Sequence, residues 1–422
     1  MRGGLARQAS PTDLDRAIRE VLDRRLRSDS ARPLAVALSG GGDSVALLLA
    51  VATWALRAGR KLLVLHVDHG LRAESTAWAE ACACRAQALG ADFQALRWTG
   101  EKPRTGLPAA ARLARHRLLA DAARKAGARV ILMGHTADDL QEAEAMRREG
   151  ATTPDPREWA PSPVWPEGRG LFILRPMLTL ARADIRDALS GRGEPWIEDP
   201  ANEDQAYARA RARGALQPDG TLAARVEPVS LRGLAEAFRM DAAGVLTAER
   251  ETLRQASLGA AARMVAMASV CAAGTERPPA RARAERLAER LRGCESMSST
   301  LAGARVEADA GEVRFLREAG EAARGGLKAV RLGNGVWDGR FEIAAAREFE
   351  IAAAAGRMAA LSPRDRAELA GVPPRARPTL PTIVQAGGPA LLLGDLQPGV
   401  RAAPLALSRL QAAAGVIERE EP

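Results

Sequence analysis

The residues best suited to chemistry form the hexapeptide Ser-Gly-Gly-Gly-Asp-Ser at positions 39–44. Glycines allow positive φ and let backbone amides approach an anion, and the hydroxyl groups can donate hydrogen bonds to phosphate oxygens. A Walker A loop would need a lysine after the glycines, and a dinucleotide-binding loop would need another glycine spacing. A tight turn with incidental glycines is the plainer alternative. We predict a phosphate-binding loop of a different type, formed by Ser39, Gly40, Gly41, Gly42, Asp43 and Ser44.

A second group of polar residues follows the apolar run that ends at Met133. His135 comes first. Asp138, Asp139 and Glu142 then fall at the start of a predicted helix, where Asp138 and Glu142 share one face. A helix dipole stabilises carboxylates at this position, so these residues could serve only as caps. They could also bind a cationic substrate or Mg²⁺.

Two further groups are candidates for binding. Arg112 and Arg115 are three residues apart and therefore lie on neighbouring parts of one helix face, where two guanidinium groups could bind phosphate or a nucleotide base. His69 belongs to segment 66–72, which follows the end of another apolar run. The simpler alternatives are a solvated basic helix face for the arginines and a surface loop for His69.

The last polar candidates are Asp199, Asn202 and Arg209, within and just after the segment 196–202. Groups of this kind could close a site over bound substrates. An Asp-Pro turn followed by an asparagine cap is the alternative explanation.

Short apolar runs alternate with helical patterns through the first part of the chain. Continuous apolar strands separated by helices indicate an α/β fold, with a Rossmann-like parallel sheet covered on both faces. Ligands of such sheets bind beyond the carboxyl ends of the strands, which is where the polar groups above lie. We predict strands at 34–38, 62–67, 92–98 and 130–133, and helices at 12–28, 44–56, 76–89 and 109–125.

The length of 422 residues predicts more than one domain. The composition shifts near 214–222, and from Thr300 the pattern alternates with recurrent glycines. We expect a catalytic domain at 1–215, a helical domain at 216–299 and a small α+β domain at 300–422. The last twenty residues are rich in alanine and acidic at the end, which predicts a loose helix or tail.

The chain carries a formal net charge of +9. This balance favours a polyanionic partner such as nucleic acid, because Lys and Arg bound to phosphates release counterions; simple solubility is the alternative. Four cysteines with no CxxC pair are too few for a disulfide scaffold. Neither a leader-like segment nor an apolar run of membrane-spanning length occurs, so we expect a cytoplasmic protein with no membrane partner.

Five segments resemble, in the same order, those of the tRNA-Ile lysidine synthetases, a family within the PP-loop ATP pyrophosphatases. The resemblance extends weakly to strand-like segments after residue 300, and between 216 and 299 it concerns helical character alone. The matching segments are 39–44 (SGGxDS), 66–72 (HVxHGLR), 110–116 (AARxxRY), 134–142 (GHxxDDxxET) and 174–202 (RPLL, then WxxDPxN).

The resemblance implies an ATP-dependent carbon–nitrogen ligase that uses Mg²⁺, whose ligands stay unassigned. It would adenylate the wobble cytidine of tRNA-Ile with a CAU anticodon and then join free L-lysine to it, giving lysidine. A monomer and a homodimer are equally compatible with it. The implied catalytic residues are Asp43, Arg112, His135, Asp139 and Glu142, and the implied substrate-binding residues are His69, Arg115, Asp138, Asp199, Asn202 and Arg209.

The chain departs from the family pattern at several positions. His116 replaces a tyrosine, and Leu140 and Ala143 stand where glutamine and threonine are common. These departures give weight to a second hypothesis, a non-catalytic RNA-binding protein with a decayed ATP site. A third hypothesis is a tRNA thiolase of the same superfamily. That chemistry usually requires paired cysteines, whereas Cys82 and Cys84 have the wrong spacing for CxxC.

Overall fold

The computed structural model describes residues 11–71, 74–148, 156–198, 230–321, 327–385 and 387–422. The chain divides into two compact units. The first comprises Met1–Glu227 together with Ile417–Pro422, and the second comprises Pro228–Val416. Three of the predicted site residues, Asp199, Asn202 and Arg209, lie outside the described residues.

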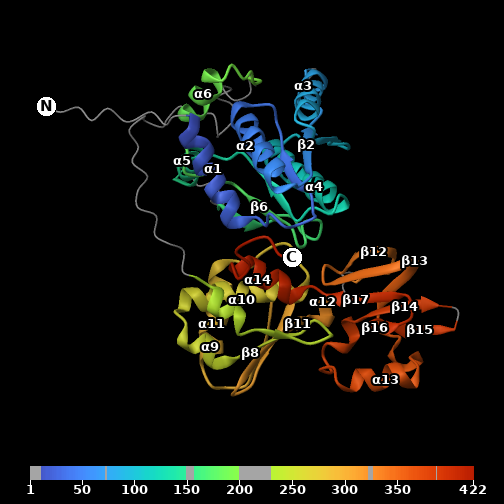
Figure 1. Ribbon diagram of the computed structural model, residues 1–422. Helices are drawn as coiled ribbons and strands as arrows, with labels where there is room; N and C mark the ends of the chain where they lie inside the picture. Colours follow the sequence, from blue (N-terminus) through green and yellow to red (C-terminus); the bar gives the residue numbers. More distant parts are fainter. Residues whose placement is uncertain (1–10, 72–73, 149–155, 199–229, 322–326, 386) are drawn as a thin grey trace. The chain divides into compact units, whose positions relative to one another are not determined.

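The first unit contains a six-stranded sheet with the order β3-β2-β1-β4-β6-β5, of which β2 and β6 are labelled in Figure 1. Five strands are parallel, and β5 pairs antiparallel with β6 at one edge. The strands near the centre of the sheet are apolar runs: β4 is fully buried, and β1 is buried except at its last residue. This architecture confirms the predicted α/β class. The strands are β1 Leu34–Ala37, β2 Leu62–Asp68, β3 Asp92–Arg97, β4 Val130–Leu132, β5 Trp159–Pro161 and β6 Phe172–Leu174.

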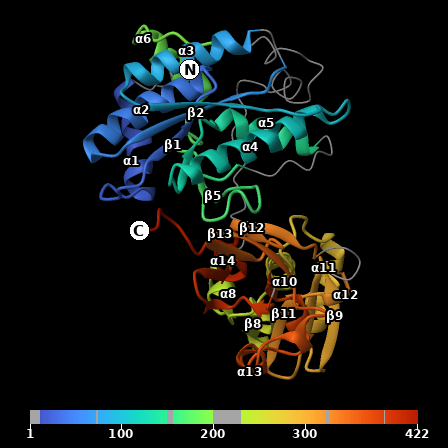
Figure 2. The same cartoon turned by 90° about the vertical axis from the view of Figure 1, so that its right-hand side faces the viewer.

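Helices cover both faces of this sheet because alternate residues of each strand enter two different cores. Val36 and Val64 pack in the core that includes α1, α2 and α6, whereas Ala35 and Leu65 pack in the core that includes α4. Figure 2 shows α2 and α4 on opposite faces. The helices are α1 Pro11–Arg25, α2 Gly42–Ala58, α3 Ser75–Ala88, α4 Leu107–Lys125, α5 Ala137–Arg148 and α6 Arg182–Gly191.

The last six residues of the chain pack within this first unit. The carboxylate of Glu420 forms a bidentate ion pair with Arg60, with nitrogen–oxygen distances of 2.6 and 2.9 Å, and both side chains are fully buried. Glu420 also accepts a hydrogen bond from the backbone N–H of Arg27 and donates its own N–H to Arg25. The expectation of a loose tail is therefore wrong for this segment.

The second unit begins with a five-stranded antiparallel sheet of order β7-β8-β11-β10-β9, whose core includes α10 and α11. Strands β7 and β8 lie in the stretch whose composition predicts helices, and β9 spans the expected boundary at 299/300. The division into three domains stays a prediction. The elements are α8 Arg232–Glu236, β7 Arg239–Met240, β8 Leu246–Glu249, α9 Arg250–Gln255, α10 Leu258–Ala273, α11 Arg281–Arg292, β9 Met297–Leu301, β10 Ala304–Ala308, β11 Glu312–Arg317 and α12 Ala319–Glu321.

A second antiparallel sheet follows, of order β15-β14-β13-β17-β16, with β12 paired to β13. Trp337, Phe341 and Ile351 are buried in its core. No helix in the described ranges is both long and apolar enough to cross a membrane. The elements are β12 Val330–Trp337, β13 Phe341–Ala353, η3 Met358–Ala360, α13 Pro363–Ala370, η4 Arg377–Thr379, β14 Pro381–Gln385, β15 Gly388–Leu391, β16 Gly394–Gln397, β17 Val400–Pro404 and α14 Ala406–Ala414.

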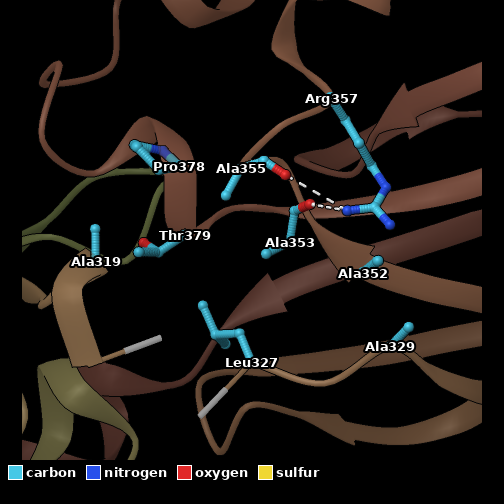
Figure 3. Close-up of a pocket in the computed structure, with 9 residues that line it drawn as sticks. All are labelled: Ala319, Leu327, Ala329, Ala352, Ala353, Ala355, Arg357, Pro378 and Thr379. Carbon is cyan, nitrogen blue, oxygen red and sulfur yellow. Dashed lines mark hydrogen bonds between the residues drawn. The ribbon is translucent and has the colours of Figure 1, made fainter. Parts of the chain in front are cut away.

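A small cavity of about 190 Å³ lies beside this sheet and is walled mainly by alanines (Figure 3). The two polar side chains that line it are already engaged. Arg357 donates to the carbonyl oxygen of Ala353 at 3.1 Å, and the Thr379 hydroxyl donates to that of Ala376 at 2.9 Å. The cavity therefore offers little chemistry of its own.

Candidate functional site

The loop at 39–44 connects β1 to α2, at the carboxyl end of a central strand. Gly40 has φ of +92°, a region that disfavours side chains, and a Cβ there would lie 2.5 Å from Cδ1 of Ile197. Gly41 is extended, with φ of −69°. Of these two glycines, Gly40 is therefore the one whose backbone conformation favours glycine.

The two serine hydroxyls hold the loop in shape. Their oxygens are 3.0 Å apart, and the Ser44 hydroxyl donates to the carbonyl oxygen of Gly41 at 2.8 Å. The Ser44 oxygen also accepts from the N–H of Ser39 at 3.2 Å. Because α2 begins at Gly42, the loop presents the N-terminus of a 17-residue helix, a suitable site for phosphate.

Gly134 brings the end of β4 against the start of α2. A Cβ at this position would lie 2.8 Å from the carbonyl oxygen of Asp43 and 3.1 Å from Cα of Ser44. Both are backbone atoms, which cannot rotate away as a side chain can. This close approach places the polar group after β4 directly beside the phosphate loop.

Gly134→Ala is therefore expected to destabilise the protein by about 1–3 kcal/mol through overpacking, and to raise the KM for ATP. Denaturant unfolding and steady-state kinetics measure the two effects. The matched control is Gly191→Ala, since a Cβ there meets no atom within 4 Å and Gly191 ends a helix. Equal behaviour of the two variants would contradict the close approach.

Three of the predicted acidic residues meet around Arg182, the first residue of α6. Its guanidinium lies 3.0 Å from Oδ2 of Asp43, 3.0 Å from Oε1 of Glu142 and 3.5 Å from Oδ2 of Asp139. The Arg182 side chain is 13% exposed and that of Glu142 is 1% exposed. Asp138 accepts the backbone N–H of Arg182 at 2.8 Å. We call Arg182, Asp43, Asp139 and Glu142 the Arg182 cluster.

Burial and charge shift the pKa values of this cluster in opposite directions. Burial raises the pKa of the Asp43 carboxyl above its ordinary value, and the charge of Arg182 only partly offsets this. Burial alone would lower the pKa of the Arg182 guanidinium, but the surrounding carboxylates raise it. The Oδ1 atom of Asp43 is buried and has no hydrogen-bond partner in the described part of the chain. This oxygen is therefore a candidate ligand for a cation.

A basic group lies beside the acidic one. Arg175, directly after β6, donates from Nε to Nδ1 of His135 at 3.2 Å and from Nη1 to the carbonyl oxygen of Arg157 at 2.8 Å. Burial, with the charges of Arg112 and Arg115 next, lowers the pKa of Arg175 to about 10. Since Nδ1 of His135 accepts, its Nε2 carries the hydrogen in the neutral ring.

Arg112, Arg115 and His135 therefore lie near one another, as expected for polar residues that follow strands of a parallel sheet. Arg175 lies in the matching segment 174–202 but was not among the predicted site residues, although it follows an apolar run just as His135 does. Concentrated positive charge of this kind suits a phosphate or an adenylate.

The two remaining histidines of interest are neutral at pH 7. Burial, followed by the charges of Arg115 and Arg112, lowers the pKa of His116 to about 2. Burial and Arg115 also lower the pKa of His69. The His69 ring meets the edge of Trp98 at 6.0 Å between centroids, and Lys102 lies 5.2 Å from the Trp98 ring centre. Trp98, expected only as the end of a strand, thus contacts the predicted binding residue His69.

The segment that precedes Asp199 lies on the phosphate loop. The N–H of Ile197 donates to the carbonyl oxygen of Gly40 at 2.9 Å, and Trp196 lies near Gly42. The described residues 196–198 therefore cover one side of the loop.

Comparisons with known proteins point to one family. A family model described as a PP-loop domain matches residues 12–219. A tRNA(Ile)-lysidine synthase of Caulobacter vibrioides is 50% identical over 416 residues, which cover 96% of this chain and 98% of that protein. Proteins with the same name from Hyphomonas neptunium and Rhizobium meliloti are 38% and 34% identical, over 65% and 86% of this chain and 79% and 85% of theirs.

Proposed function

Because this chain belongs to the tRNA(Ile)-lysidine synthase family, we propose that it joins free L-lysine to the wobble cytidine of tRNA-Ile with a CAU anticodon, using ATP. The residue assignments rest on the position of Asp43, which belongs both to the phosphate loop and to the Arg182 cluster. One residue thus joins the site for ATP to the group of carboxylates suited to an ammonium.

The reaction has two steps. The C2 carbonyl oxygen of cytidine attacks the α-phosphorus of ATP, pyrophosphate leaves, and the base carries AMP on that oxygen. The ε-amine of lysine then forms a bond to C2, the bond from C2 to the adenylated oxygen breaks, AMP leaves, and the amine loses its proton.

The phosphate loop would hold the phosphates of ATP through its amides and the N-terminus of α2. Mg²⁺ is commonly held by one or two carboxylates together with substrate phosphates, and it would neutralise the phosphate charge. Asp43 fits this role, because its buried Oδ1 has no hydrogen-bond partner among the described residues. The protein would then share the ion with ATP, since no three His, Cys, Asp or Glu side chains in the described ranges form a metal-binding group.

Lysine must reach the base as a neutral amine. The ordinary pKa of its ammonium is about 10.4, so deprotonation at pH 7 costs about 4–5 kcal/mol. A carboxylate that binds the ammonium can also accept its proton. Asp139 and Glu142 are the candidates, since both are almost fully buried and face the same cation, Arg182.

The basic group would stabilise the negative charge that develops on the adenylate. Arg112 and Arg115 supply fixed charge, and His135 supplies an Nε2–H donor because Arg175 binds its Nδ1. His69 and Asp138 are proposed substrate-site residues, with Asp138 acting through the N–H of Arg182.

The net charge of +9 supports binding of a whole tRNA, with phosphate contacts supplying affinity and the unpaired anticodon bases supplying identity. The proposed location is the cytoplasm, where tRNA, lysine and ATP meet.

The alternative functions are less well supported. Burial raises the pKa of the Cys82 thiol to about 11, which makes it a poor nucleophile, and Cys84 is exposed; a thiolase needs more reactive sulfur. A decayed site would be expected to lose its charged residues. Instead the unusual Leu140 and Ala143 are buried apolar side chains, and the Arg182 cluster is intact.

The test is incorporation of labelled lysine into tRNA-Ile with a CAU anticodon, compared with tRNA-Met, which has the same anticodon. We expect ATP-dependent incorporation into the first only, with pyrophosphate released. Binding of tRNA without ATP turnover would refute the proposal and favour the RNA-binding alternative.

A further inference from the structure

We propose that Arg182 is a positioning residue that couples the ATP site to the lysine site. The inference rests on the proposed function, because it assigns Asp43 to the first site and Glu142 to the second. One guanidinium contacts both carboxylates, so the two halves of the reaction share a structural support.

The geometry of the guanidinium carries this inference. Its Nε donates to Asp43, on α2, at 3.0 Å, and its Nη1 donates to Glu142, on α5, at 3.0 Å. A guanidinium is planar and holds its donors in a rigid fork, so these two bonds set the separation of the two carboxylates. A lysine side chain in place of Arg182 would carry a single point charge on a flexible stem and could not impose that separation.

Each carboxylate also keeps an oxygen that Arg182 does not use in these two bonds. The bond to Asp43 involves Oδ2, which leaves Oδ1 for a cation. In the Arg182 cluster three carboxylates face this one guanidinium. A group of carboxylates suits the two cations that the reaction brings, Mg²⁺ and the lysine ammonium.

The start of α6 does not depend on this side chain. The start of α6 is held by Asp138, which accepts the backbone N–H of Arg182, and almost any residue supplies that N–H. The same helix carries a second arginine, Arg186, whose ion pair with Glu198 at 3.3 Å is largely exposed. Arg186 thus provides a matched control that lies one helical turn away.

Arg182→Gln is expected to raise the KM for ATP and the KM for lysine, each by about tenfold or more, because charge-assisted hydrogen bonds to both carboxylates are lost. Asp43→Ala should instead act mainly on the ATP-dependent first step, and Glu142→Ala mainly on the KM for lysine. Arg182→Lys keeps the positive charge but lacks the forked donors of a guanidinium. We therefore expect it to raise both KM values less than Arg182→Gln does. Arg186→Gln should behave as the wild type.

Steady-state kinetics with each substrate varied in turn separate the outcomes. A fall in kcat with both KM values unchanged would indicate a loss of folded enzyme and would overturn the coupling. A rise in only one KM would also overturn it. If the wild-type chain incorporates no lysine, the proposed function fails instead, so the two failures are distinguishable.

Discussion

Asp43→Ala should lower both pyrophosphate release and lysine incorporation by about a hundredfold or more, the range seen when one electrostatic group is removed from a transition-state site. The side chain contributes its Oδ1, proposed as a ligand of Mg²⁺, and its bond to Arg182. Pyrophosphate release measured without lysine isolates the first step. Activity close to that of the wild type would refute the assignment of the loop.

The companion variant Asp43→Asn separates function from folding. Burial raises the pKa of the Asp43 carboxyl, so its ionisation is less favourable in the folded chain than in the unfolded chain. The stability linked to this group is present at low pH and lost as the pH rises through the folded pKa. At neutral pH we therefore expect Asp43→Asn to unfold at the same or a higher denaturant concentration than the wild type, while remaining inactive.

Glu142→Ala should raise the KM for lysine by about thirtyfold or more and leave ATP-dependent adenylation of the tRNA intact. Truncating one partner of a buried charge pair costs about 2 kcal/mol or more, and here it also leaves the charge of Arg182 facing the incoming ammonium. Adenylated tRNA formed without lysine, and the lysine dependence of the second step, are the two measurements.

The matched control for this variant is Glu144→Ala, on the same helix. Glu144 is exposed and pairs with Arg147 on the surface, so its loss should change neither measurement. An unchanged KM for lysine in Glu142→Ala would remove Glu142 from the lysine site.

Much of the first unit follows from local pattern. Buried strands such as β1 and β4 are unbroken apolar runs, and a parallel sheet brings the residues after such runs to one edge. For this reason the sequence predicts that Ser39–Ser44, His135 and Glu142 lie at the same edge of the sheet. Strands β7 and β8 were missed because they are short and lie within an alanine-rich, helix-like composition.

The contacts between side chains of the site could not be predicted in the same way. Arg182 and Asp43 are 139 residues apart, and their contact depends on how α6 packs against α2. The sequence contains dozens of arginines, and charge alone does not reveal which of them are buried. Arg175 and Arg182 differ from the exposed Arg186 only in where the fold directs their side chains.

The ion pair between Arg60 and Glu420 has a consequence for dissecting the protein. A fragment that stops at 227 would contain the PP-loop match but not Glu420, since the final hexapeptide belongs to the first unit. Breaking a buried ion pair by removing one partner costs about 3–5 kcal/mol, a large part of the stability of a domain. The catalytic unit is therefore not a detachable module, and a truncated version needs the last six residues fused to it or added as a peptide.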